Sequence, residues 1–246
     1  MTEIIFKNNS SMRKNLLCIF IFLFLFIAIF SMVSQCYAIN SDGVNKLPGK
    51  KNISNNLGSV SLEVFGNPKS NTKIAYIIGM HPLENKVHNA LYSQLKSKSK
   101  KLKYKYYVYR VTVKKNPFSY DKGRMNGQLL AQKFILSHAK KAKYNLVIDV
   151  HSNRGTLNGG SYKKTNFIFA PLNNLKSKAI GNKILKKIPD ISYYYPSSQT
   201  SPKYCTVPLV KSGTKTIIYE TYGYEKPAKT KSLINKLINT VDSLSF

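Results

Sequence analysis

The stretch that decides the fold is a short apolar segment that runs into polar residues, KIAYIIGMHPLE, residues 73–84. Its first half, Lys73–Ile78, is almost wholly apolar, which is typical of a strand buried on both faces. The residues that follow, Glu84–Leu95, carry apolar side chains at helical spacing. A buried strand joined to an amphipathic helix is the repeating unit of an α/β sheet.

The same alternation of strands and helices continues to the end of the chain. The expected strands are 60–65, 73–78, 104–113, 146–150, 166–170 and 216–219. The expected helices are 84–95, 124–141, 175–187 and 230–244. We therefore predict an α/β fold with helices on both faces of the sheet, and ligands that bind beyond the carboxyl ends of the strands.

The N-terminal segment has the pattern of an export signal. Arg13 and Lys14 precede the apolar run Leu16–Phe30, and Cys36-Tyr37-Ala38 ends it. A basic region, an apolar region and a small-x-Ala end predict a secretory signal cut after Ala38, or an N-terminal membrane anchor if it is not cut. The protein is thus expected to be exported, either to the outside or to the cell surface.

These patterns divide the chain into three parts. Residues 1–38 are the signal or anchor, and residues 39–58 form a flexible linker rich in Asn, Gly, Lys and Ser. Residues 59–246 form the α/β domain. Of the three cysteines, only Cys205 lies outside the leader, so the sequence predicts no disulfide framework.

The chain is strongly basic, with 39 Lys and Arg against 10 Asp and Glu and a net charge of +29. One interpretation is an anionic partner, such as a cell wall polymer or a membrane surface. The other is codon drift, because only four of the 39 basic residues are arginine. Nucleic acid is disfavoured as a partner, since no basic stretch alternates with aromatic residues as a base-stacking surface would.

Polar residues follow three of the expected strands at the sheet edge where ligands bind. They are His81 and Glu84 after KIAYII, His151 after LVIDV, and Glu220 after TIIY. Two imidazoles and one carboxylate make a three-ligand zinc site that leaves a position for water. A second carboxylate, Glu220, is then available to take and return a proton. Asp149 would orient His151 from behind.

These motifs resemble the signature of the zinc carboxypeptidase superfamily, including its succinylglutamate desuccinylase and aspartoacylase branch. The matching residues are His81-Pro82-Leu83-Glu84, Asp149-Val150-His151 and Ile218-Tyr219-Glu220, in the family order and each after a strand. The resemblance covers roughly residues 60–246. It implies a three-layer fold with a mixed, mostly parallel sheet. It also implies one zinc ion held by His81, Glu84 and His151, with Glu220 as the catalytic acid and base.

The resemblance also implies residues that bind the substrate. An arginine of the family holds the substrate carboxylate, and Arg124 stands at the matching place, although Gly123 replaces the asparagine expected before it. Arg154, three residues after His151, is a replacement for that missing contact. The family often places a tyrosine in a loop before the catalytic glutamate, and Tyr204 and the run Tyr193–Tyr195 are the candidates.

The function expected from these residues is an exported zinc hydrolase that cleaves an amide bond next to a free carboxylate. Its substrate would be a peptide or an N-acyl amino acid. The alternative is a non-catalytic relative, in which the same fold serves as a basic module that binds the cell wall or a membrane.

Overall fold

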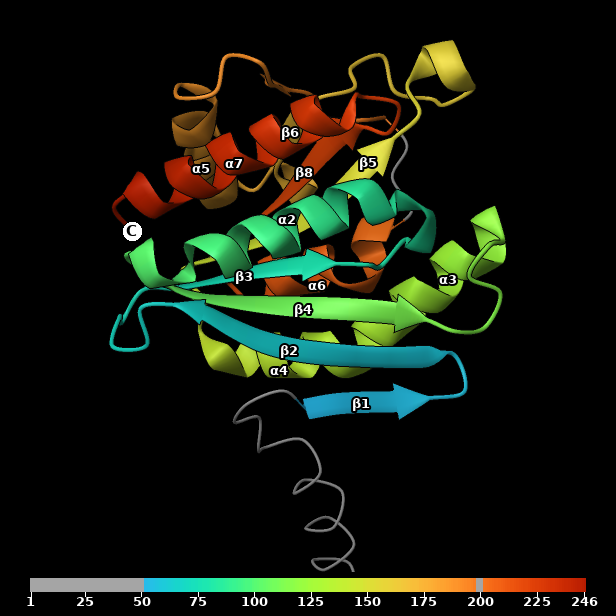
Figure 1. Ribbon diagram of the computed structural model, residues 1–246, viewed down its shortest axis with the longest axis horizontal. Coiled ribbons are helices and arrows are strands. Elements are labelled where there is room, and N and C mark those ends of the chain that lie inside the picture. Colours follow the sequence, from blue (N-terminus) through green and yellow to red (C-terminus); the bar gives the residue numbers. More distant parts are fainter. Residues whose placement is uncertain (1–50, 198–200) are drawn as a thin grey trace, which may run out of the picture. The chain divides into compact units, whose positions relative to one another are not determined.

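An eight-stranded sheet organises the computed structural model, which describes residues 51–197 and 201–246 (Figure 1). The strands are β1 Lys51–Asn55, β2 Gly58–Gly66, β3 Lys73–Ile78, β4 Lys105–Val113, β5 Leu146–Asn153, β6 Phe167–Phe169, β7 Ser192–Tyr193 and β8 Thr216–Tyr222. Their order across the sheet is β1-β2-β4-β3-β5-β8-β6-β7. The central strands β4, β3, β5 and β8 are parallel, whereas β2 pairs antiparallel with β1 and β4, and β6 pairs antiparallel with β8. This mixed, mostly parallel sheet confirms the predicted fold class.

Helices cover both faces of the sheet. They are α2 Asn85–Lys98, α3 Tyr120–Leu130, α4 Leu136–Ala142, α5 Leu175–Leu185, α6 Thr206–Lys211 and α7 Pro227–Ser243. Helices α2, α5 and α7 pack on one face, and α3, α4 and α6 lie against the other (Figure 1). The three layers follow from the sequence, because strands apolar on both sides must be covered on both sides.

The central strands supply the core from alternate residues. Ile74, Tyr76 and Ile78 of β3 are buried in the cluster shared with α2 and α7. Ala75 and Ile77, which point the other way along the same strand, are also buried. The strand is therefore held in register from both faces, and this register determines where the following residue, His81, emerges.

Strands β5 and β8 run further than the sequence patterns predict. The expected ends were residues 150 and 219, but β5 continues to Asn153 and β8 to Tyr222. His151 and Glu220 are thus inside the sheet, where they are direct register partners. Polar side chains are accepted here because both strands end at the same pocket, described below.

Residues 51–58 do not form the flexible linker predicted for residues 39–58. Instead of a flexible segment they form β1 and the turn into β2, with Ile53 opposite Val60. The side-chain oxygen of Asn55 accepts hydrogen bonds from the backbone N–H groups of Leu57 and Gly58, at 2.9 and 3.3 Å. Asn and Gly promote this hairpin turn. The composition that indicated a linker therefore belongs to an edge strand and its turn, while residues 39–50 lie outside the described residues.

The structure also contains three elements that were not predicted from the sequence, β1, β7 and α6. All three are short or lie at a sheet edge.

The predicted signal or anchor, residues 1–38, lies outside the described residues, all of which belong to one unit, Pro48–Phe246. Within residues 51–197 and 201–246, every helix is too short or too polar to cross a bilayer.

Helix α3 begins four residues earlier than predicted and lies unusually close to the chain that follows β3. Ser119 caps it by accepting a hydrogen bond from Lys122 N–H at 3.3 Å. A β-carbon placed on Gly127 would lie 1.8 Å from the carbonyl oxygen of Met80. Only glycine allows this approach, which carries the α3 side chains to the residue next to His81.

We expect the substitution Gly127→Ala to destabilise the protein by about 1–3 kcal/mol, because the clash with Met80 outweighs the better helix propensity of alanine. The control is Gly181→Ala in α5, where the nearest atom to an added β-carbon, in Ile168, is 3.4 Å away. That variant should be neutral or slightly more stable. Urea denaturation followed by circular dichroism measures both, and equal stability of the two variants would contradict the packing argument.

Candidate metal centre and active-site pocket

A single turn of 3-10 helix brings the first two candidate ligands together. The turn η1, Pro82–Glu84, follows His81 directly, and Glu84 N–H donates to the carbonyl oxygen of His81 at 3.1 Å. Because this helix has three residues per turn, residues three apart lie one above the other. His81 Nδ1 therefore lies 2.8 Å from Glu84 Oε1.

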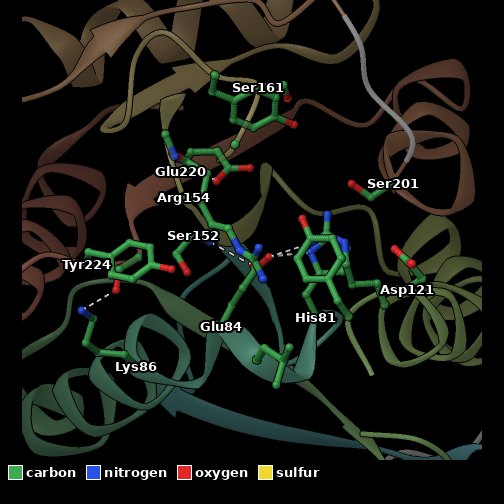
Figure 2. Close-up of a pocket in the computed structure, with 18 residues that line it drawn as sticks. His81, Glu84, Lys86, Asp121, Ser152, Arg154, Ser161, Ser201, Glu220 and Tyr224 are labelled. Carbon is green, nitrogen blue, oxygen red and sulfur yellow. Dashed lines mark hydrogen bonds and ion pairs between the residues drawn. The ribbon is translucent and has the colours of Figure 1, made fainter. Parts of the chain in front are cut away.

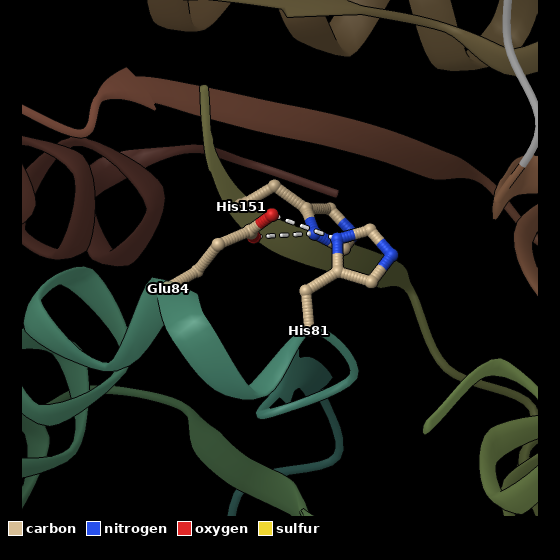
Figure 3. Close-up of side chains that lie close together, drawn as sticks. All are labelled: His81, Glu84 and His151. Atoms are coloured by element: carbon tan, nitrogen blue, oxygen red, sulfur yellow. Dashed lines mark hydrogen bonds and ion pairs between the residues drawn. The ribbon is translucent and has the colours of Figure 1, made fainter. Parts of the chain in front are cut away.

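The third candidate ligand comes from the neighbouring strand β5. His151 Nδ1 lies 3.0 Å from Glu84 Oε2, so the carboxylate stands between the two imidazoles (Figure 3). The two rings are 4.4 Å apart between centroids. One ligand atom of each of the three residues lies within 4.8 Å of the others, and all three residues are buried. The structure thus assembles the predicted set His81, Glu84 and His151.

The Glu84 carboxylate has two further donors. Ser152 N–H donates to Oε2 at 3.0 Å, and Arg124 Nη1 donates to Oε1 at 2.9 Å. Burial by itself raises the pKa of a carboxyl group, but His81 and His151 outweigh it and hold the pKa of Glu84 well below its usual range. Glu84 is therefore a charged carboxylate enclosed by donors.

The two histidines have different partners behind them. His151 Nε2 lies 3.0 Å from Asp149 Oδ2. Burial lowers the pKa of His151, but Asp149 and Glu84 outweigh it and raise that pKa well above its usual range. For His81, burial dominates and lowers the pKa to about 4. His88, the other buried histidine, points to the Val150 carbonyl oxygen at 2.9 Å from its Nε2 and is not part of the cluster.

A pocket of about 520 Å³ opens over the cluster (Figure 2). Its walls are mostly polar and come from the ends of β3, β5 and β8, the start of α3 and the loop after β5. The lining residues are His81, Leu83, Glu84, Lys86, Tyr120, Asp121, Arg124, Ser152, Asn153, Arg154, Gly155, Gly160, Ser161, Tyr162, Ser201, Glu220, Gly223 and Tyr224.

Glu220 faces this pocket from β8 and is only 7% exposed. Asn153 Nδ2 donates to its Oε2 at 3.2 Å, and the same amide donates to the carbonyl oxygen of Thr165 at 2.9 Å. Burial raises the pKa of Glu220 to about 8. The structure thus holds a second carboxyl group beside the cluster, separate from the ligand set and able to exchange a proton near neutral pH.

Both predicted arginines line the pocket, and one aromatic ring contacts both. The Arg124 and Arg154 guanidinium carbons lie 5.0 and 4.5 Å from the centre of the Tyr120 ring. Stacking on an aromatic face stabilises a guanidinium and holds it in place. Arg124 also donates to Glu84, so it lies beside the candidate metal ligands, and Arg154 lines the same cavity beside Tyr120.

Tyr204 is not among the residues that line the pocket, and neither is any residue of Tyr193–Tyr195. Tyr204 ends a short 3-10 turn, Ser201–Tyr204, just before α6. The tyrosines that do line the pocket are Tyr120, Tyr162 and Tyr224. The role of Tyr204 as a substrate contact stays a prediction.

Asn153 and Tyr120 are two further residues of the site that were not predicted from the sequence. Asn153 lies two residues after His151, so the Asp-x-His motif extended by two residues could have indicated it. Tyr120 lies four residues before Arg124, a helical spacing that the late predicted start of α3 concealed.

The donor set of the cluster fits zinc. Imidazole nitrogen and carboxylate oxygen are ordinary zinc ligands, and three protein ligands beside an open cavity are typical of catalytic rather than structural zinc. The Nδ1 atoms of His81 and His151 both face the Glu84 carboxylate. At its other ring nitrogen His151 has the carboxylate of Asp149, a partner that metal-binding histidines commonly have.

Several solved structures of other proteins share this fold. A metallo-carboxypeptidase from Burkholderia cenocepacia matches with a TM-score of 0.53 and 11% identity, over 85% of this chain and 68% of that one. A carboxypeptidase-like protein from Burkholderia mallei matches with a TM-score of 0.51 and 13% identity, over 81% and 64%. The product-bound cell shape determinant protein Csd4 from Helicobacter pylori matches with a TM-score of 0.51 and 12% identity, over 74% and 54%.

The chain therefore has a metallocarboxypeptidase fold, and it spans 54–68% of the length of these three proteins. No protein-family model matches the sequence, and no curated protein shows significant similarity to it. At such low identity the likeness is one of fold. It confirms, as a statement about fold, the resemblance to the zinc carboxypeptidase superfamily that the three motifs carry.

We expect the purified protein to contain one zinc ion per chain, and His151→Ala to lose it, because two ligands leave the site open to water and to chelators. The control is His138→Ala, since His138 lies outside the cluster. Elemental analysis after extensive dialysis measures the metal content. A wild-type protein without bound metal, or a His151→Ala variant that keeps it, would contradict the assignment.

Proposed function

We propose that this protein is a zinc-dependent hydrolase that cleaves an amide bond next to a free carboxylate. The observation that carries the proposal is the arrangement in one pocket of a buried His–Glu–His cluster, a separate buried carboxyl group at Glu220 and two arginines. A metallocarboxypeptidase fold supports it. The substrate is a peptide or an N-acyl amino acid.

His81, Glu84 and His151 would hold the metal. Zinc bound there supplies Lewis acidity, which lowers the pKa of water and polarises a carbonyl oxygen. The cavity beside the cluster admits the scissile amide, and its walls bring the carbonyl carbon within reach of Glu220.

Glu220 is the proton carrier. Its carboxylate accepts a proton from the attacking water while the water oxygen bonds to the carbonyl carbon. When the carbon–nitrogen bond breaks, Glu220 donates that proton to the leaving nitrogen, so the protein ends in its starting state. Asn153 holds Oε2 of Glu220, which leaves the other oxygen to exchange the proton.

The two arginines have different tasks. Arg124 contacts Glu84 and so lies beside the reacting carbonyl, where its positive charge stabilises the oxygen as negative charge develops on it. Arg154, which lines the pocket and lies against Tyr120, binds the free carboxylate of the substrate. The family resemblance assigned the substrate carboxylate to Arg124; the contact of Arg124 with Glu84 favours Arg154 instead.

We further propose that the protein works outside the cytoplasm, as its N-terminal sequence indicates. A chain of net charge +29 would be attracted to anionic walls or membranes. Wall or environmental peptides would then be within its reach.

We expect Glu220→Gln to lower kcat by about 10²- to 10⁴-fold, the range of general acid–base catalysis, while zinc content stays unchanged. The control is Glu225→Gln, because Glu225 lies five residues further on, bonded to Asn166 and outside the pocket lining. Turnover of a panel of N-acyl amino acids and short peptides measures both. Unchanged turnover in Glu220→Gln would exclude the mechanism, and absence of activity in the wild type would favour the non-catalytic basic module.

We expect Arg154→Met to raise KM about 10- to 100-fold with little change in kcat, because a charged hydrogen bond made equally in ground and transition states is lost. Arg110→Met is the control, since Arg110 lies on β4 and contacts Asn89 and Tyr92 outside the pocket. The same comparison on C-terminally amidated substrates should show no effect of Arg154→Met. A fall in kcat at constant KM would place Arg154 at the reacting carbonyl instead.

A further inference from the structure

One face of helix α3 presents three functional side chains at intervals of four residues. Tyr120 and Arg124 line the pocket, and Gln128, one turn further on, reaches His81. Residues four apart lie on the same side of a helix. Gly127 lets this side approach the backbone of Met80, the residue before His81.

Gln128 is buried, 3% exposed, and its amide meets the ring nitrogen of His81 that points away from Glu84. The distance from Gln128 Nε2 to His81 Nε2 is 3.2 Å. Within the described residues, this is the one side-chain hydrogen bond of Gln128. A buried amide that contacts a single imidazole nitrogen has a specific partner and is not merely filling space.

The position of the proton on His81 decides what Gln128 does. Nδ1, the nitrogen that faces Glu84, can bind a metal only through its lone pair, so the ring proton must be on Nε2 when a metal is bound. An Nε2–H group requires an acceptor, which is the amide oxygen of Gln128. A half-turn of the amide brings that oxygen to the ring in place of the nitrogen, without changing the shape of the side chain.

We propose that Gln128 is a positioning residue of the metal centre: its amide oxygen accepts the Nε2–H of His81 and holds that ring in the tautomer that offers Nδ1 to the metal. This inference rests on the proposed metal-dependent function. Gln128 itself contacts neither metal nor substrate. Its effect is on how tightly the metal is held.

The two histidines of the candidate site therefore differ in the partner of the ring nitrogen that faces away from Glu84. His151 has the carboxylate of Asp149 behind it, and a carboxylate makes an imidazole a stronger ligand. His81 has a neutral amide, which fixes the tautomer without adding negative charge. His81 is therefore the weaker of the two ligands, and the partner at position 128 sets the affinity of the site.

The test is the zinc dissociation constant, measured by competition with a chromogenic chelator at pH 7.5. Gln128→Met keeps the length of the side chain but removes the acceptor, and it should weaken zinc binding about 10- to 100-fold. Gln128→Glu keeps an oxygen acceptor and should bind zinc as tightly as the wild type or more tightly. Gln132→Met, at an exposed position one turn further along, should bind as the wild type does.

The second measurement is the state of the His81 Nε2–H group in the zinc-loaded protein, from the nitrogen chemical shifts of its imidazole and the rate at which that proton exchanges with solvent. In the wild type and Gln128→Glu the Nε2–H should be hydrogen-bonded and slow to exchange, whereas in Gln128→Met it should exchange faster. If Gln128→Met keeps both the slow exchange and the zinc affinity, or if Gln128→Glu loses as much affinity as Gln128→Met, the inference is overturned. A wild-type protein that binds no zinc overturns the proposed function and this inference together.

Discussion

The structure depends on the compensation of one buried negative charge, the carboxylate of Glu84. An unpaired charge in the interior costs several kcal/mol, so the chain must supply donors to it. They come from three separate segments: His81 in its own turn, His151 and Ser152 in β5, and Arg124 in α3. The carboxylate thereby joins the turn after β3, the end of β5 and the start of α3 at one place.

This constraint also explains how the rest of the pocket is arranged. Parallel strands β3, β5 and β8 end at the same edge, so residues far apart in the chain converge there. Helix α3 crosses that edge closely because Gly127 has no side chain, and it brings Tyr120, Arg124 and Gln128 to the centre. The positions of the candidate metal ligands and of the residues that support them therefore both follow from one packing arrangement.

Much of the site could be predicted from the sequence because the residue types that form it are rare in this chain. Most of the positive charge is lysine distributed over the chain, whereas carboxylates and histidines are few. When rare residues such as His81, Glu84, His151 and Glu220 all follow buried strands, an apolar core gives no reason for them and a ligand does. Tyrosine is common in this chain, so the choice of Tyr204 had no such support. The tyrosines that line the pocket are Tyr120, Tyr162 and Tyr224.

The order of strands and helices, and the four rare polar residues at the strand ends, were determined by the sequence alone, because periodicity and local motifs are properties of neighbouring residues. What only the tertiary structure decided are contacts between segments distant in sequence: Asn153 with Glu220, Tyr120 with Arg154, and Gln128 with His81. The edge strand β1 was concealed for a similar reason, since its pairing with β2, and not its composition, makes it a strand. Such contacts depend on how strands pair and on how closely α3 approaches the sheet, and no local pattern records either.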